Sequence, residues 1–166
     1  MATANLESLF LDTLRDIYYA EHKITKALPK MASAAQSPEL AAAFEQHLAE
    51  TEVQIERLEQ VFEMLGEEPE GKQCAAMDGI VAEGEEIMLT YKGTVALDAG
   101  LIAAAQAVEH YEIARYGTLC SWAGTLGMAD AAALLEETLA EETATDEALT
   151  DLAETSVNDA AVEEVD

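Results

Sequence analysis

Two glutamates interrupt the apolar face of a helix that the sequence predicts over residues 102–120. Apolar residues recur there at three- and four-residue steps, namely Ile102, Ala105, Ile113, Tyr116 and Leu119. Glu109 stands one heptad after Ile102 and one before Tyr116, and Glu112 lies one turn further along the same face. Burying an unpaired carboxylate costs several kcal/mol, so this placement predicts a proton, a cation or a metal ion beside it.

The first and last helical segments repeat this pattern. Glu21 lies between Leu14 and Leu28 in one heptad series, and Glu142 lies between Leu135 and Leu149 in another. Each glutamate therefore occupies the middle of a leucine row that should face a core. We expect Glu21, Glu109 and Glu142 to converge there.

The helix predicted after Ser37 carries other polar groups on its apolar face. Its stripe consists of Leu40, Phe44, His47, Thr51, Gln54, Leu58 and Val61. Glu50 lies on the margin of this stripe, between His47 and Gln54, and Asp146 lies one turn beyond Glu142 in the last segment. Imidazole, amide and carboxylate groups are all metal-ligand types.

Length and composition predict one all-α domain. The chain has 166 residues, half of them apolar, with only three prolines and an excess of Ala, Leu and Glu. We expect a helical domain over residues 1–154 and an acidic, flexible tail over residues 155–166.

The charge excludes some function classes. There are 34 acidic residues against 8 Lys or Arg, which gives a formal net charge of -26. Such a surface repels nucleic acid and anionic lipid. It is typical of proteins adapted to a salt-rich cytoplasm, and it gives no information about activity.

The sequence also predicts a cytoplasmic protein. The N-terminal residues have no basic segment followed by a long apolar core, so we expect no signal peptide, and no stretch is long enough to span a bilayer. Cys74 and Cys120 form no C-x-x-C pair, and we expect both to be reduced, buried thiols.

Capping signals predict the helix ends. The first helix should run from Leu6, capped by Asn5, to about Ala35, with a bend at Pro29. The second should open at Ser37-Pro38 and stop at Gly66. A shorter helix should lie in the connection to the central helix, and a fourth long helix should follow Gly127.

The four long helices resemble a doubled pair. Glu21 and Glu109 are 88 positions apart in similar surroundings, and Glu50 and Glu142 are 92 apart. Two such halves joined by a long crossover are typical of a ferritin-like four-helix bundle, in which each helix pair donates carboxylates to a central two-metal site.

Several motifs also resemble those of the YciE/YciF-like proteins, a ferritin-like family tied to bacterial stress responses. They are Tyr-Tyr-Ala-Glu at 18–21, His-Leu-Ala-Glu-Thr at 47–51, Gln-Ile-Glu-Arg-Leu-Glu at 54–59, Cys-Ala-Ala-Met at 74–77, residues 103–113, and Glu-Thr-Ala-Thr-Asp at 142–146. The resemblance covers about Leu6 to Leu152. It implies a ferritin-like bundle, dimerisation and a di-iron centre.

The sequence departs from the common di-iron pattern. Ferritin-like oxidases carry Glu-x-x-His on their second and fourth helices, whereas Val53 and Thr145 stand where the two histidines are expected. His47, Gln54 and Asp146 could supply ligands from neighbouring turns. The candidate ligands are therefore Glu21, Glu50, Glu109, Glu112, Glu142, Gln54, Asp146 and His47. Hard oxygen ligands favour iron or manganese over zinc.

Two hypotheses from different classes follow. The first is an oxidoreductase-like di-iron or manganese protein whose metals react with a small oxidant such as oxygen or peroxide. The second is a metal-free structural or interaction protein that retains the bundle with a vestigial site. We expect a homodimer in either case, because apolar residues of the first helix and the crossover would be exposed on a lone bundle.

Overall fold

The computed structural model describes residues 4–162, which are helical apart from their connections. The long helices are α1 (Leu6–Ala34), α2 (Pro38–Leu65), α3 (Ala75–Thr90), α4 (Leu97–Thr125) and α5 (Ala129–Leu152). A π-helical turn, η1 (Ala153–Val157), and the short helix α6 (Asn158–Ala160) follow. The prediction of an all-α protein is confirmed.

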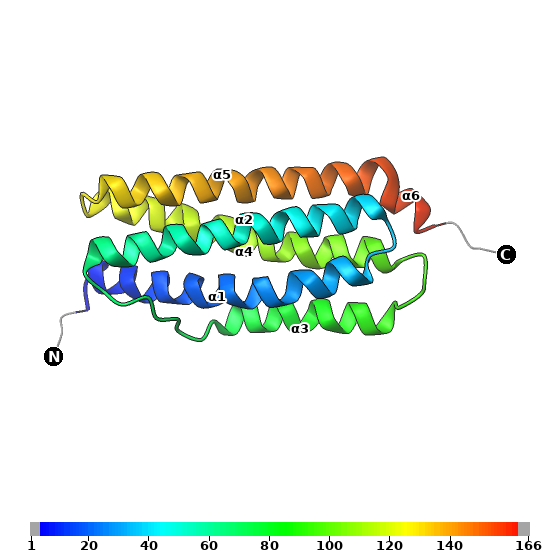
Figure 1. Cartoon of the computed structure of the whole chain (residues 1–166), viewed down its shortest axis with the longest axis horizontal. Coiled ribbons are helices and arrows are strands. Elements are labelled where there is room, and N and C mark those ends of the chain that lie inside the picture. Colours follow the sequence, from blue (N-terminus) through cyan, green and yellow to red (C-terminus); the bar gives the residue numbers. More distant parts are fainter. Residues whose placement is uncertain (1–3, 163–166) are drawn as a thin grey trace.

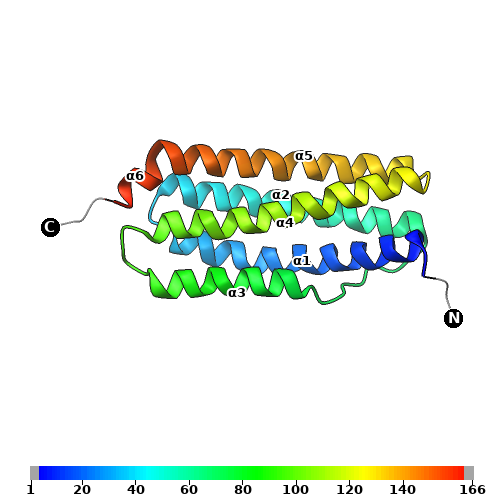
Figure 2. The same cartoon turned by 180° about the vertical axis from the view of Figure 1, so that it is seen from behind.

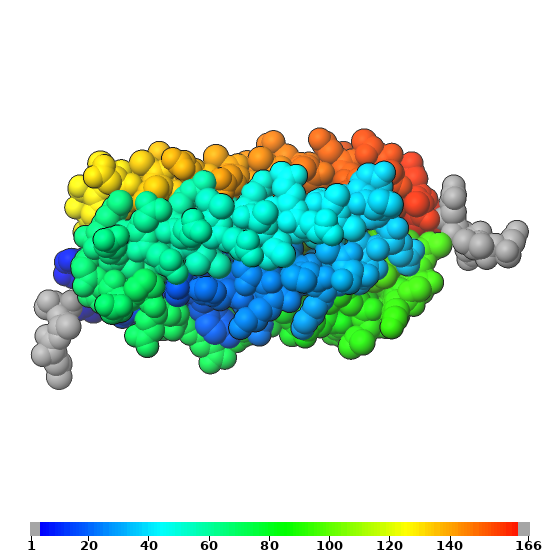
Figure 3. Space-filling model, viewed as in Figure 1, coloured from blue at the N-terminus to red at the C-terminus, as the bar shows by residue number. Residues whose placement is uncertain are grey.

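Helices α1, α2, α4 and α5 form a four-helix bundle, and α3 packs outside it against α1 and α4 (Figure 1 and Figure 2). Helices α2 and α4 run in the same direction, so the chain between them must cross the length of the bundle, and α3 lies in this crossover. This is the predicted ferritin-like arrangement. Figure 3 shows α2 along one face of the molecule, between α5 and α1.

The helix starts that the sequence predicts from capping residues are confirmed. Asn5 accepts a hydrogen bond from the backbone of Ser8, and Ser37 accepts one from the backbone of Leu40. Helix α2 stops at Gly66, whose φ of 68° lies in the left-handed region. Helix α1 continues through Pro29 as one helix.

Helix α4 is longer than the stretch 102–120 predicted from its periodicity. Its first turn contains Asp98, whose carboxylate accepts hydrogen bonds from the backbone amides of Gln36 (2.8 Å) and Ser37 (2.7 Å). Asp98 therefore fastens the turn between α1 and α2 to the start of α4.

The chain does not lose its helical structure at Thr155, where the polar composition predicts a flexible tail. Residues 153–160 are helical, and Val157 is buried against the core. Residues 163–166 of the predicted tail lie outside the described part. Within residues 4–162, no helix is both long and apolar enough to cross a membrane.

Candidate metal centre

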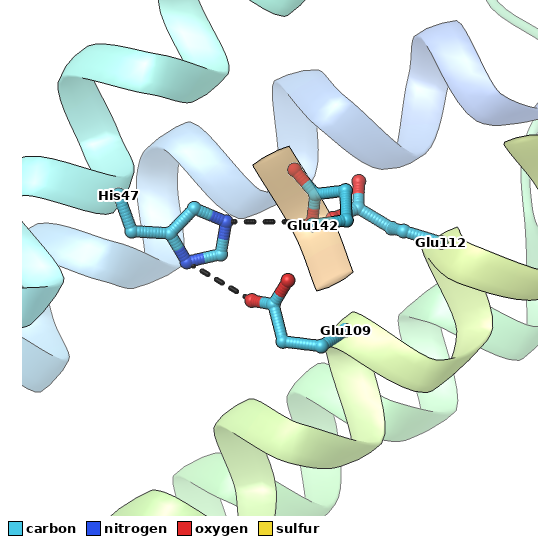
Figure 4. A group of neighbouring side chains, drawn as sticks. All are labelled: His47, Glu109, Glu112 and Glu142. Carbon is cyan, nitrogen blue, oxygen red and sulfur yellow. Dashed lines mark ion pairs between the residues drawn. The ribbon is translucent and has the colours of Figure 1, made fainter. Parts of the chain in front are cut away.

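Four buried side chains from three helices converge in the middle of the bundle. His47 comes from α2, Glu109 and Glu112 come from α4, and Glu142 comes from α5 (Figure 4). One ligand atom from each residue lies within 4.8 Å of the others. A cluster of three carboxyl groups and an imidazole at this depth has the composition of a metal site.

The heptad pattern explains why these side chains point inward. Leu14 and Leu28 of α1 and Leu135 and Leu149 of α5 are all buried, as the leucine rows predict. The glutamates between them, Glu21 and Glu142, are fully buried, and so are Glu109 and Glu112. The apolar stripes that hold the bundle together therefore also place the carboxyl groups in its core.

The ring of His47 lies between two of the carboxyl groups. Its Nδ1 is 3.1 Å from Glu109 Oε1, and its Nε2 is 3.8 Å from Glu142 Oε2 (Figure 4). Burial lowers the pKa of His47, although Glu142 and Glu50 act in the opposite direction. The imidazole is therefore neutral near pH 7, the form in which histidine binds a metal.

Only some of the buried carboxyl groups are ionised in the metal-free protein. Burial and the nearby Glu142 raise the pKa of both Glu109 and Glu112 well above the ordinary range. Burial alone would also raise the pKa of Glu142. Glu109 and Glu112 lie close enough to share their protons with its carboxylate, which stabilises the ionised form, so the pKa of Glu142 is lowered on balance. Without a metal, the group of carboxyls therefore retains protons at neutral pH, and Glu109 and Glu112 are the residues whose pKa favours holding them.

Glu21 lies at the α1 side of the cluster, against Tyr116. The Tyr116 hydroxyl donates a short hydrogen bond to Glu21 Oε1, and the other carboxyl oxygen has no partner among the described residues. Burial and the charge of Glu142 raise the pKa of Glu21 to about 8. Glu21 therefore belongs to the same electrostatic unit as the other three glutamates.

Gln54 is oriented by two acidic neighbours. Its amide nitrogen donates hydrogen bonds to Glu142 Oε1 and, at 3.0 Å, to Glu141 Oε2. Arg57 holds Glu141 through two contacts of 2.7 Å. Because both neighbours of the amide nitrogen are carboxylates, the amide oxygen must point the other way, and it is buried without a partner.

Comparison with known proteins places the chain in a family. A family model described as a domain of unknown function, DUF892, matches residues 5–162. The chain belongs to the DUF892 family. Protein YciF of Escherichia coli strain K12 is 47% identical over 140 residues, which are 84% of each protein.

Several solved structures share the fold. The crystal structure of the E. coli stress protein YciF matches with a TM-score of 0.89 and 47% identity, covering 94% of this chain and 99% of that one. YcfI of Rhodopseudomonas palustris, for which a structural role is suggested, matches with a TM-score of 0.87 and 48% identity, covering 90% and 97%. The protein XCC3681 of Xanthomonas campestris matches at 0.70 and 26%, covering 93% and 94%.

Four candidate ligands lie outside the four-residue cluster in this DUF892 chain: Glu21 and Gln54 interact with its members, whereas Glu50 and Asp146 have other partners. Glu50 is half-buried and accepts hydrogen bonds from Gln46 (2.9 Å) and Thr145 (3.4 Å). Asp146 is contacted by Gln106 (3.2 Å) and His110 (3.1 Å). Both residues lie at the edges of their helix faces, where a side chain reaches the neighbouring helix instead of the core.

The sequence pattern missed the groups that support the centre. Arg57 and Glu141 were not singled out, although Arg57 follows Gln54 by three residues and therefore lies on a neighbouring part of the same helix face. Tyr116, a member of the apolar stripe of α4, donates its hydroxyl to Glu21. Tyr18 donates to Glu59 on the surface, at 3.0 Å.

The spacing of two contacting residues bears on the proposed internal repeat. Gln54 contacts Glu142, and these residues are 88 positions apart, the same spacing as Glu21 and Glu109. A single offset of 88 would therefore align Gln54 with Glu142, whereas the offset of 92 aligns Glu50 with it.

The donor atoms of the centre fit a hard divalent metal. Although several of them lie close together, as His47 Nδ1 and Glu109 Oε1 do at 3.1 Å, the following buried atoms make no hydrogen bond of acceptable geometry to the described residues: Glu21 Oε2, both ring nitrogens of His47, Gln54 Oε1, both oxygens of Glu109 and of Glu112, and Glu142 Oε2. Native proteins rarely leave so many buried polar atoms unpaired in one place. Oxygen donors with one imidazole suit iron(II) or manganese(II).

Proposed function

We propose that the protein is a metal-binding stress protein whose buried centre holds two iron or manganese ions. One observation carries this proposal: His47, Glu109, Glu112 and Glu142 of α2, α4 and α5 bring ligand atoms within 4.8 Å of one another, and these buried residues have atoms without a hydrogen-bond partner among the described residues. A protein core that has no ligand to bind would normally pair these atoms or replace them with apolar groups.

The residues would hold the metals in complementary ways. The carboxylates of Glu21, Glu109, Glu112 and Glu142 would balance the charge of two divalent ions, with His47 and the oxygen of Gln54 as neutral ligands. Binding would release the protons that Glu109 and Glu112 hold in the metal-free protein. Such ions would supply redox chemistry with oxygen or peroxide.

The relatives support the biological setting of this proposal. YciF of E. coli is described as a stress protein, and the similarity covers nearly the whole of both chains. We extend that role to this protein because detoxifying a small oxidant is a reaction that a buried redox metal could perform.

Elemental analysis tests the proposal. Protein produced with iron or manganese should retain about two ions per chain, as expected of a two-metal site. Glu109→Gln should lose most of this metal, whereas Glu136→Gln, which changes an exposed glutamate of α5, should keep it. Equal metal contents in the two variants would assign the metal to the acidic surface and contradict the proposal.

A metal-free structural protein is the second candidate. The hydrogen bonds from Tyr116 to Glu21 and from Gln54 to Glu142 favour it, because they pair part of the centre without any metal. In this case the protons held by Glu109 and Glu112 would stabilise the core permanently. Metal content near zero and an unchanged melting temperature on adding iron(II) or manganese(II) would support it.

A further inference from the structure

An apolar pocket lies between α1, α3 and α4 and reaches the proposed metal centre. Its walls include Ile24 and Leu28 of α1, Gly84 and Met88 of α3, and Ala104 and Ala105 of α4. His47 and Glu109 line its inner end. The crossover helix therefore closes a space directly beside two candidate ligands.

The size of the pocket restricts what can enter it. Its volume is about 30 Å³. About 10–15 Å³ on this measure accommodates one water-sized molecule, so the pocket suits a diatomic molecule and is too small for an organic substrate.

The polarity of the pocket restricts the occupant further. The residues along its walls are apolar, and its polar groups lie at the ends: His47 and Glu109 inside, and the Lys30–Glu85 ion pair (3.0 Å) at the outer rim. A buried water molecule needs two to four polar partners, and hydrogen peroxide needs partners for both of its hydroxyl groups. Apolar walls disfavour both molecules and leave dioxygen as the matching oxidant.

Small residues keep the space open. Gly84 of α3 faces Ala104 of α4, and a Cβ added at Gly84 would meet the Cβ of Ala104 at 3.4 Å. A single methyl group at this position would therefore fit against the neighbouring helix while it occupies part of the pocket.

We propose that this pocket binds dioxygen and delivers it to the inner end at His47 and Glu109. The proposal rests on the proposed function, since it assigns dioxygen, and not peroxide, as the oxidant of that centre. It also gives α3, which adds no ligand to the centre, a role as the outer wall of the binding site.

Xenon binding to the metal-free protein tests the pocket itself. Xenon is an apolar atom that occupies dry cavities of proteins. Under xenon pressure, backbone amide NMR signals of Gly84, Ala104 and Ala105 should shift with saturation. Gly84→Ala should weaken this binding by roughly tenfold, because a well-packed space resists an added group.

Gly79→Ala is the matched control. Gly79 lies in the same helix, is exposed, and has open space around an added Cβ. Both variants therefore gain the same helix propensity, but only Gly84→Ala narrows the pocket. Xenon should bind to Gly79→Ala as to the unchanged protein. Absence of saturable shifts in the unchanged protein, or equal binding to both variants, would overturn the proposal.

Oxidation of the iron-loaded protein tests delivery. Stopped-flow mixing with dioxygen should show slower iron oxidation in Gly84→Ala than in Gly79→Ala, while mixing with hydrogen peroxide should show equal rates. Equal rates with dioxygen, or equal slowing with both oxidants, would refute delivery through the pocket. Iron content measured on the same samples distinguishes failure of the proposed metal centre from failure of the proposed pocket. Protein that binds no iron would contradict the metal centre, and the xenon experiment would still test the pocket.

Discussion

Substitution of Glu109 distinguishes best between two roles for this residue, that of a metal ligand and that of a partner in a buried ion pair. In the metal-free protein its carboxyl group is held protonated by burial, so glutamine copies both its charge and its shape. We expect Glu109→Gln to leave the metal-free protein as stable as before, or slightly more stable, and to abolish most of the rise in melting temperature on adding iron(II) or manganese(II). Thermal unfolding with and without metal measures both effects.

The control for this prediction is Glu136→Gln, which should change neither quantity. A loss of several kcal/mol in metal-free Glu109→Gln would instead identify a buried ion pair. The group that could form such a pair is His47, which lies 3.1 Å from Glu109 and which burial favours in its neutral form. Lys23 instead contacts Asp78 at 3.2 Å, and Arg115 contacts Tyr111.

Glu21 gives the metal-free protein a specific pH dependence. Its pKa rises from 4.5 in the unfolded chain to about 8 in the folded protein. Between these values the folded state holds a proton that the unfolded state has lost, so this residue's contribution to stability is full below pH 4.5 and is lost as the pH rises to 8. The lost contribution should amount to a few kcal/mol.

Calorimetry should be run on the unchanged protein and on Glu21→Gln, both with a chelator. Comparing the two isolates the pH dependence that Glu21 contributes to the free energy of unfolding, because both proteins retain His47, whose contribution has the opposite sign. The stability of the unchanged protein relative to the variant should decline between pH 5 and pH 8. Parallel curves over this range would show that Glu21 is ionised in the folded protein.

Periodicity predicts which residues face the core. It does not predict the exact rotation of each helix about its axis, which decides the position of residues at the margins of the apolar stripe. Glu21, Glu109 and Glu142 stand at the centre of their apolar stripes, so the sequence was sufficient to predict that all three are buried. Glu50 and Asp146 stand at the margins, where a small rotation against a neighbouring helix decides between core and surface. That rotation depends on packing between helices, which one helix's sequence does not contain.

At the scale of the elements, Arg57 links α2 to α5 beside the centre. Its guanidinium group contacts both oxygens of Glu141, which in turn accepts a hydrogen bond from Gln54. Lysine cannot form this paired contact. We expect Arg57→Lys to lower the free energy of unfolding by about 1–2 kcal/mol and to weaken metal binding, because Gln54 loses its support.

Urea unfolding and a metal titration measure these effects. Arg15→Lys is the matched control, since Arg15 pairs with Glu67 at 3.1 Å in a more exposed position than Arg57, where an ion pair contributes less. If the two variants behave alike, the contact between Arg57 and Glu141 has no special role.

Helix boundaries were predictable where a side chain caps the helix. Asn5, Ser37 and Gly66 mark their ends by local chemistry, and the structure agrees at all three. Helices α4 and α5 start without any side-chain cap, so their first turns carry no such signal. The burial of Val157 within a polar stretch likewise depends on a long-range contact.

At the scale of the whole molecule, apolar side chains remain exposed near the end of α3. Leu89 is 78% exposed, and Tyr91 and Val95 follow it in the same connection. We expect this region to form a homodimer contact. Light scattering should give the dimer mass for the unchanged protein and a lower mass for Leu89→Lys.

Val162, the last residue of the described chain, is 80% exposed, so Val162→Lys is a matched control that should remain dimeric. A monomer mass for the unchanged protein at molar and at low salt would contradict the prediction. If both variants are dimeric, the dimer contact does not involve the end of α3.

The direction of α2 and α4 has a consequence for how the protein is made. Because the crossover separates the two halves, α1 and α2 leave the ribosome as a hairpin before α4 and α5 exist. In that hairpin Glu21 faces water and is ionised; only docking of the second hairpin removes the water around it and the other glutamates. Completing the fold therefore takes protons from the medium, and a metal ion that enters the finished centre returns them.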